Sequence, residues 1–379
     1  MTQPDRPDVR IPDQLLPADG RFGSGPSRVR QESVQRLVEA APTYLGTSHR
    51  QAPVKSMVGR LRAGLSDLLA LPEGYEIVLG NGGSTLFWDA AIFGLIDQRS
   101  QHLAFGEFSS KFGAGVKAAP FLQEPEIIES APGTHPTAVG RPGIDLYALT
   151  QNETSTGVAM EVHRPEGADS SAIVAVDATS AAGGLRVDPT QFDCYYFAPQ
   201  KCFGSDGGLW VAACSPAGIE RIERIAASDR WIPAGLDLKV ALDNSRLDQT
   251  LNTPALATLF LFVDQVEWMN DNGGLEWAAS RCDSSAEAIY GWAEASSFAT
   301  PFVEKPDERS HVVATVDFDT SVDANVVAKV LRANGIVDTE SYRKLGRNQL
   351  RVALFPATDP ADVAALTGCI DHVVERLAG

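Results

Sequence analysis

The chain has 379 residues, of which 44% are apolar, and it carries a formal net charge of −17 at pH 7. This length is typical of two domains rather than one, and the apolar content is sufficient for a large buried core. The negative charge argues against nucleic acid or an anionic membrane as a partner. Five cysteines without a Cys-x-x-Cys pair, together with six scattered histidines, predict neither a disulfide framework nor a metal site.

The first ten residues are polar, so the sequence predicts no secretory signal. No apolar run is long enough to span a bilayer. We therefore expect a cytoplasmic protein. Residues 1–20 are rich in proline and aspartate, and we expect them to form an N-terminal extension.

A glycine-rich turn follows the first expected strand. A helix is expected over residues 53–71 and a strand over 75–79, and the turn Gly80–Thr85 then leads into an apolar helix over 86–96. Backbone N–H groups, the positive end of a helix and the hydroxyls of Ser84 and Thr85 together suit a phosphate group. A simple helix cap has the same residues, so this turn alone does not decide between the two interpretations.

Two reactive side chains follow the next predicted central strands. The apolar run 173–176 is typical of a buried parallel strand and ends in Asp177, where open α/β sheets bind ligands. A turn or cap aspartate would look the same. An aromatic strand over 193–198 leads to Gln200 and Lys201 in a second glycine-rich turn. Burial there would leave Lys201 as a neutral, nucleophilic amine, whereas the alternative is an exposed turn lysine.

Four features together suit pyridoxal 5'-phosphate as a cofactor. The phosphate needs a helix N-terminus, the ring needs a flat face such as that of Phe108, and the pyridine nitrogen needs a carboxylate such as Asp177. Lys201 would then form the Schiff base with the cofactor. No single feature is specific, but their order along the chain is.

The C-terminal part predicts a separate α+β unit. The segment Asn252-Thr253-Pro254 breaks the chain before a long helix over 255–270. Helices over 274–296, 324–334 and 360–377 then alternate with strands over 312–318, 336–337 and 349–355. We expect an α/β fold with a mostly parallel central sheet, helices on both of its faces, a large domain over 21–265 and a small domain over 266–379.

Several short motifs resemble those of the phosphoserine aminotransferases, a family of fold-type I enzymes that depend on pyridoxal phosphate. The resemblance extends from about residue 22 to the end of the chain. The motifs are Ser24-Gly25-Pro26, Ser48-His49-Arg50, Gly83-Ser84-Thr85, Gly106-Glu107-Phe108, Asn152-Glu153-Thr154, Asp177-Ala178-Thr179-Ser180, Gln200-Lys201, Asn252-Thr253-Pro254 and Leu350-Arg351-Val352.

The resemblance implies a homodimer and assigns a role to each candidate residue. The catalytic residues would be Lys201, as the Schiff-base lysine, and Asp177, as the partner of the pyridine nitrogen. The cofactor-binding residues would be Gly83, Ser84, Thr85 and Gln200 at the phosphate, Phe108 and Thr154 at the ring, and Asn252 and Thr253 at the cofactor of the neighbouring subunit. The substrate-binding residues would be Arg351, at the α-carboxylate, and His49 and Arg50, at the distal anion.

The implied reaction transfers the amino group of L-glutamate to 3-phosphohydroxypyruvate, giving O-phospho-L-serine and 2-oxoglutarate. A related phosphorylated keto acid of pyridoxine synthesis is a second expected substrate. Phe108 stands where relatives carry Trp, and the basic segment with Arg343, Lys344 and Arg347 leaves open which of them contacts the substrate phosphate. The alternatives are an alanine:glyoxylate-type aminotransferase, a cysteine desulfurase, for which no cysteine is suitably placed, and a non-catalytic protein that binds pyridoxal phosphate.

Overall fold

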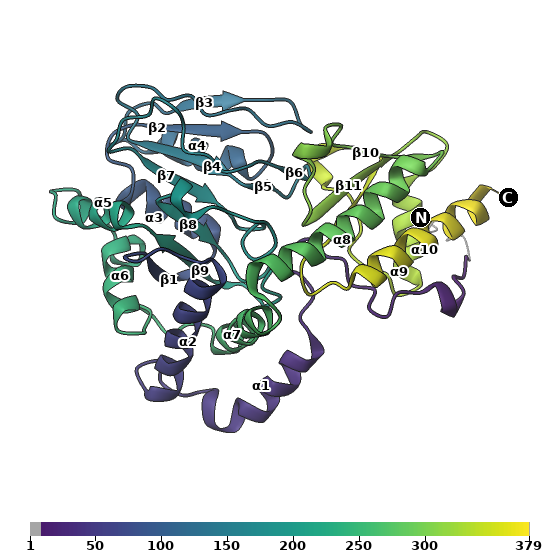
Figure 1. Cartoon of the computed structure of the whole chain (residues 1–379), viewed down its shortest axis with the longest axis horizontal. Helices are drawn as coiled ribbons and strands as arrows, with labels where there is room; N and C mark the ends of the chain where they lie inside the picture. The colour runs from purple at the N-terminus through teal and green to yellow at the C-terminus, as the bar shows by residue number, and fades with distance from the viewer. Residues whose placement is uncertain (1–8, 379) are drawn as a thin grey trace, which may run out of the picture.

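The computed structural model describes residues 9–378, which form two sheets with helices packed on both (Figure 1). The larger sheet has seven strands in the order β1-β9-β8-β7-β4-β2-β3, and the smaller has three in the order β10-β11-β12. The strands of the larger sheet are β1 (Glu76–Gly82), β2 (Ser100–Ala104), β3 (Glu126–Glu129), β4 (Leu146–Thr150), β7 (Ile173–Asp177), β8 (Cys194–Phe197) and β9 (Gly208–Cys214). Those of the smaller are β10 (Ala299–Pro301), β11 (Val313–Phe318) and β12 (Gln349–Ala353), and a separate ribbon pairs β5 (Asn152–Glu153) with β6 (Val158–Ala159).

The larger sheet is parallel except at one strand. β2 pairs in parallel with β3 and β4, and β7 does so with β4 and β8. Only β9 runs the other way, because it is antiparallel to both of its neighbours, β1 and β8. The mostly parallel central sheet expected from the sequence is therefore confirmed, and the carboxyl ends of its parallel strands meet at one edge.

Helices cover both faces of the larger sheet (Figure 1). Alternate residues of one strand point to opposite faces, so that Val211 of β9 packs with α2 and α7 while Trp210 packs with α3 and α6. The helices are α1 (Gln31–Tyr44), α2 (Ala52–Leu68), α3 (Ser84–Gly94), α4 (Ser109–Ala118), α5 (Pro216–Ala226), α6 (Leu238–Arg246), α7 (Leu256–Asp271), α8 (Gly274–Ala295), α9 (Ala324–Ala333) and α10 (Pro360–Ala378). None of the helices in residues 9–378 is both long and apolar enough to cross a membrane.

The start of the described chain belongs to the core of the smaller sheet. Ile11 and Phe22 are buried with side chains from α8, α9, α10 and the smaller sheet, and Figure 1 shows this purple segment beside α9 and α10. Residues 1–8 of the expected extension lie outside the described residues. The division into residues 1–20, 21–265 and 266–379 stays a prediction.

Three local expectations were wrong. β1 continues to Gly82 instead of ending at Leu79, because Gly80 and Asn81 pair with Trp210 and Leu209 of β9. Helices α4 and α6 were missed; α4 contains two glycines, which weaken its helical pattern, and only tertiary packing reveals it. Val337 makes a single bridge, to Arg21, rather than the short strand expected over residues 336–337.

The extended β1 depends on a glycine at its centre. A Cβ at Gly80 would lie 2.1 Å from ring atoms of Trp210 on the paired strand. We expect Gly80→Ala to lower the free energy of unfolding by about 1–3 kcal/mol, because the buried indole would have to move. Gly291→Ala, in the exposed part of α8 with open space around it, is the control, and it should stabilise by about 0.5–1 kcal/mol. Urea denaturation measures both; equal effects of the two substitutions would contradict the packing argument.

Candidate active site

A cavity of about 200 Å³ lies at the carboxyl edge of the larger sheet. Its residues come from the ends of β4, β7 and β8 and from the first turn of α3, which is where open α/β sheets bind ligands. The lining residues are Gly83, Ser84, Thr85, Trp88, Phe108, Thr150, Asn152, Thr154, Asp177, Thr179, Ser180, Gln200 and Lys201. The structure thus brings eight of the predicted site residues together in one cavity.

Lys201 is held by a segment that enters from the start of the chain. Its Nζ donates a hydrogen bond of 2.5 Å to the carbonyl oxygen of Ser24. Ser27 Oγ donates to the carbonyl oxygen of Lys201 at 2.6 Å, which fixes the backbone of the same turn. A Cβ at Gly25 would lie only 1.9 Å from Nζ, so residue 25 must be a glycine for the lysine to take this position.

The surroundings of Lys201 destabilise the charged form of its amine. Desolvation lowers the pKa of its amine from 10.5 to about 8, and the positive charge of Arg351 adds to this shift. A neutral amine is a nucleophile and a base, whereas an ammonium group is neither. The alternative of an ordinary exposed turn lysine therefore does not describe Lys201.

Asp177 ends β7 and is almost fully buried. Oδ2 accepts a hydrogen bond from Trp88 Nε1 at 3.1 Å, and Oδ1 accepts one from the backbone N–H of Thr179 at 2.9 Å. Burial raises the pKa of this carboxyl group, and the Thr179 hydrogen bonds oppose the shift. A cation in the cavity would favour the ionised carboxylate, so Asp177 suits a protonated ring nitrogen.

The first turn of α3 forms the opposite end of the cavity. Gly83 precedes it in an extended conformation, and no side chain of the described residues caps the helix. The backbone N–H groups of Ser84 and Thr85 are therefore at the positive end of a helix, which favours an anion. The side-chain oxygens Asn152 Oδ1 and Gln200 Oε1 are buried without a hydrogen-bond partner among the described residues, which is typical of a polar ligand site. These groups fit pyridoxal 5'-phosphate.

Phe108 is fixed at the rim of the cavity by a residue whose function the sequence did not indicate. Glu153 Oε2 accepts hydrogen bonds from the backbone N–H groups of Phe108 at 3.0 Å and Ser109 at 2.8 Å, and so caps α4. A Cβ at Gly106 would lie 2.3 Å from Glu153 Cγ, so this loop closes tightly around the carboxylate. Glu153 therefore sets the position of the aromatic ring without lining the cavity.

Other residues of the cavity were also absent from the prediction. Thr179 Oγ1 donates to Ser84 Oγ at 2.7 Å, and Thr154 Oγ1 donates to Ser180 Oγ at 2.7 Å. Trp88 had a signal in the sequence, since it lies four residues after Ser84 and hence on the same face of α3.

Arg351 of β12 lies next to the cavity without lining it. Its Nη1 donates to the carbonyl oxygen of Thr154 at a long 3.3 Å. Its Nε is buried and has no hydrogen-bond partner among the described residues, and burial lowers the pKa of the guanidinium. A buried guanidinium with free donors suits a carboxylate ligand.

His49, Arg50, Asn252 and Thr253 lie together but outside this cavity. Arg50 Nη1 donates to Gln249 Oε1 at 2.5 Å, and Thr253 Oγ1 lies 3.0 Å from His49 Nδ1. Arg50, Asn252 and Thr253 are exposed. The structure therefore places these four predicted residues together on one surface and not around Lys201 of the same chain. We call this surface, after its first and last residues, the 49–253 edge.

The basic segment before Arg351 separates into two engaged side chains and one that is free. Lys344 Nζ donates to Glu107 Oε1 at 2.5 Å, and Arg347 pairs with Asp317. Arg343 is exposed and makes no hydrogen bond or ion pair with residues 9–378.

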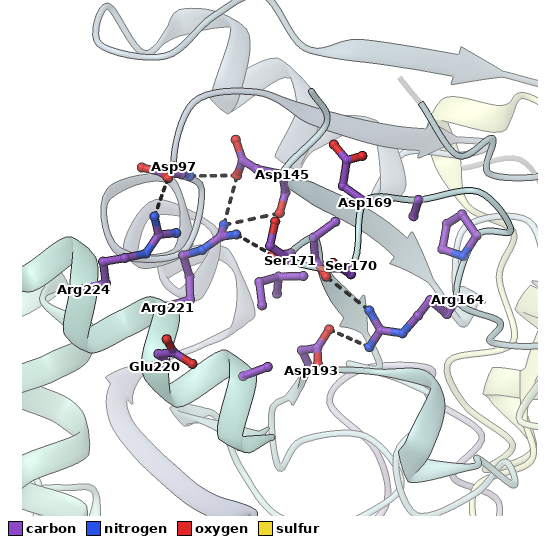
Figure 2. A pocket seen from close by; sticks show the side chains of 15 residues that line it. Asp97, Asp145, Arg164, Asp169, Ser170, Ser171, Asp193, Glu220, Arg221 and Arg224 are labelled. Carbon is purple, nitrogen blue, oxygen red and sulfur yellow. Dashed lines mark hydrogen bonds and ion pairs between the residues drawn. The ribbon is translucent and has the colours of Figure 1, made fainter. Parts of the chain in front are cut away.

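A larger cavity, of about 700 Å³, lies at the opposite, amino edge of the sheet (Figure 2). Ion pairs and hydrogen bonds between neighbouring elements line it. Figure 2 shows that its arginines point at carboxylates and carbonyl oxygens of neighbouring elements. The pairs are Arg221–Asp145 at 3.0 Å, Arg164–Asp193 at 2.7 Å and Arg224–Asp97 at 3.0 Å. Because these arginines are already paired, this cavity offers less free binding capacity than the one at Lys201.

Comparison with known proteins gives consistent matches over nearly the whole chain. The family model of the class-V aminotransferases matches residues 23–340. The putative phosphoserine aminotransferase of Mycobacterium leprae (strain TN) is 59% identical over 371 residues, which cover 98% of each chain. The phosphoserine aminotransferase of Rhodococcus jostii (strain RHA1) is 59% identical over 367 residues, covering 97% of this chain and 98% of that protein.

A solved structure supports the same fold. The crystal structure of a phosphoserine aminotransferase from Cytophaga hutchinsonii superposes with a TM-score of 0.85 at 25% identity, covering 93% of this chain and 99% of that one. The predicted fold class, the aminotransferase activity and the pyridoxal phosphate cofactor are confirmed. The chain belongs to the class-V aminotransferases and, within them, to the phosphoserine aminotransferases.

Proposed function

We propose that this enzyme transfers the amino group of L-glutamate to 3-phosphohydroxypyruvate, giving O-phospho-L-serine and 2-oxoglutarate. The observation that carries the proposal is a desolvated amine, Lys201, which faces the same cavity as the buried carboxylate of Asp177. The names of the relatives at 59% identity support the choice of substrates.

The residues of the cavity divide between holding the cofactor and moving a proton. Pyridoxal 5'-phosphate, when bound, supplies an electron-accepting ring that stabilises the charge left on a substrate after its α-proton is removed. Asp177 would hold the pyridine nitrogen, Phe108 one face of the ring and Thr154 the ring hydroxyl. Gly83, Ser84, Thr85 and Gln200 would hold the phosphate.

Lys201 acts as the base and then as the acid. Its neutral Nζ would take the proton from Cα of the amino donor and pass it to the bound cofactor, and in the second half-reaction it would return a proton from the cofactor to Cα of the acceptor. A pKa of about 8 suits both directions, because the amine gains and loses the proton at little cost near neutral pH. Arg351 binds the α-carboxylate and so keeps Cα within reach.

Arg343 is the residue we assign to the substrate phosphate. Lys344 and Arg347 are already engaged with Glu107 and Asp317, whereas Arg343 has no partner among residues 9–378. A guanidinium can bind either a phosphate or a carboxylate in bidentate geometry, so Arg343 could serve both substrates of the cycle.

The 49–253 edge is the surface we assign to a second copy of the chain. His49 Nε2 is buried without a partner among the described residues, while Val34, Val38 and Leu45 of the adjoining α1 region are 42%, 67% and 42% exposed. Exposed apolar side chains near a buried imidazole nitrogen without a partner among the described residues suit a homodimer interface. Across that interface, Asn252 and Thr253 would reach the partner's cofactor phosphate, and His49 and Arg50 the distal anion of its substrate.

Two narrower expectations complete the proposal. A phosphorylated keto acid of pyridoxine synthesis would share the α-carboxylate and the phosphate, so the same arginines would bind it.

The five cysteines are all free and buried, which is consistent with a reducing compartment such as the cytoplasm.

Comparing amino donors tests the function and the role of Arg343 together. We expect the wild type to use phosphoserine and glutamate well and alanine poorly, since alanine has no distal anion. Arg343→Gln should lower kcat/KM for phosphoserine by about ten- to a hundred-fold, because one charge-assisted contact is lost, and leave alanine unchanged. Arg347→Gln, in the same segment but paired with Asp317, is the matched control and should have less than about a threefold effect.

Two results of that comparison would contradict the proposal, one for the function and one for the role of Arg343. If alanine is the best donor of the wild type, the alanine:glyoxylate-type alternative replaces it. If Arg347→Gln has the effect expected of Arg343→Gln, the function stands and the phosphate contact has been assigned to the wrong arginine.

Complementation between one inactive and one impaired variant tests the dimer. In a heterodimer of one Lys201→Ala subunit and one Arg50→Ala subunit, a site that takes its lysine from one chain and its arginine from the other is intact. Differently tagged subunits, co-expressed and purified as the heterodimer, should therefore recover about half of the wild-type activity, since one of two sites is whole. Activity no higher than the mean of the two mutant homodimers would show that Arg50 serves its own subunit.

A further inference from the structure

Tyr342 lies between two residues that have separate assigned roles. Its ring is 5.9 Å from the ring of Phe108, at an angle of 57°, and the guanidinium of Arg351 lies 5.3 Å from its centroid. Tyr342 belongs to a short hairpin, because Glu340 bridges to Leu350 and the chain then returns along β12 to Arg351. One ring therefore contacts both the group assigned to the cofactor ring and the group assigned to the substrate carboxylate.

Arg351 has little else to hold its guanidinium in place. Its one side-chain hydrogen bond, to the carbonyl oxygen of Thr154, is 3.3 Å long, and its Nε has no partner among residues 9–378. No carboxylate pairs with it in that part of the chain. The aromatic face of Tyr342 is thus the main contact that can orient the guanidinium before a ligand arrives.

The second neighbour of the Tyr342 ring, Phe108, is held by several hydrogen bonds. Phe108 is held through its backbone N–H by Glu153, and the next residue back, Glu107, has its N–H bonded to Ser155 Oγ at 3.0 Å. The side chain of Glu107 also pairs with Lys344, two residues after Tyr342, at 2.5 Å. This ion pair is exposed and contributes little energy, but it places the hairpin over the rim of the cavity.

We propose that Tyr342 is a positioning residue that holds Arg351 in a fixed position relative to Phe108. The α-carboxylate of a substrate is then bound at a fixed position relative to the cofactor ring. The proposal rests on the proposed function, because it takes Arg351 as the carboxylate-binding residue. Tyr342 acts through its ring and not through its hydroxyl group. Its loss therefore weakens the binding of every ligand with a carboxylate at Arg351, whatever its distal group.

The first experiment measures binding without turnover. Glutarate, a dicarboxylate that has no amino or keto group, is titrated into the holoenzyme and followed by the absorbance of the bound cofactor. Tyr342→Leu should raise its Kd by about three- to thirtyfold, whereas Tyr342→Phe, which keeps the ring, should change it by less than about twofold. Equal losses in the two variants would show that the hydroxyl group is what matters, and would overturn the proposal.

A matched control comes from the same hairpin. Arg347 lies 4.4 Å from the centroid of the Phe302 ring, so Phe302→Leu removes a comparable cation–π contact that does not involve Arg351. It should leave the Kd of glutarate unchanged. If Phe302→Leu weakens glutarate as much as Tyr342→Leu does, the effect is general loosening of the hairpin and the proposal is wrong.

A double-mutant cycle shows whether Tyr342 acts through Arg351. Tyr342→Leu should lower kcat/KM for glutamate by about three- to thirtyfold through KM in the wild-type background, but by less than about twofold when Arg351→Gln is already present. Additive effects would contradict the proposal. Failure of the proposed function looks different, since the wild type itself would then not transaminate glutamate.

Discussion

The hydrogen bond from Lys201 Nζ to the carbonyl oxygen of Ser24 joins parts of the molecule that are far apart in the sequence. Two residues before Ser24, Phe22 is buried in the core of the smaller sheet, and three residues after it, Ser27 is bonded to the backbone of Lys201. The reactive turn of the larger sheet is therefore held by a segment that begins in the core of the smaller sheet. This segment contacts the amine of Lys201, whose pKa is lowered chiefly by desolvation.

The buried carboxyl group of Glu153 fixes the residues at the rim of the cavity. Glu153 touches neither the cavity nor solvent, yet it binds the backbone N–H groups of Phe108 and Ser109 and both polar groups of Ser155. A carboxyl group that accepts four hydrogen bonds holds its neighbours at fixed positions. The ring contact that we assign to Phe108, and through it to Tyr342, depends on this carboxylate.

The sequence predicted the groups that follow directly from strand ends. Asp177 and Lys201 follow apolar runs, and the carboxyl ends of parallel strands must meet at one edge of the sheet, so their proximity could be inferred without coordinates. Glu153, Trp88 and Tyr342 act through tertiary contacts, which have no period or spacing in the sequence. Trp88 alone could have been found, from its position one helical turn after Ser84.

The same reasoning explains where the fold was misjudged. Gly80 and Asn81 look like a turn, but their pairing with β9 overrides their weak strand preference. In α4, Gly113 lies against His102 and Ile127, where a Cβ would be a close 3.3 Å from both side chains, so tertiary packing favours a glycine that local helix propensity disfavours. The contact that we propose between the 49–253 edge and a second copy of the chain has no local pattern either, because it would join two chains.

We assign to Lys201 both the covalent bond to the cofactor and the transfer of the proton. Reduction of the holoenzyme with borohydride, followed by proteolysis and mass mapping, identifies the lysine that carries the cofactor. We predict that the reduced cofactor is found on the peptide that contains Lys201, and that Lys201→Ala holoenzyme gives no adduct. An adduct on a different lysine, or an undiminished adduct in Lys201→Ala, would contradict the assignment of this site.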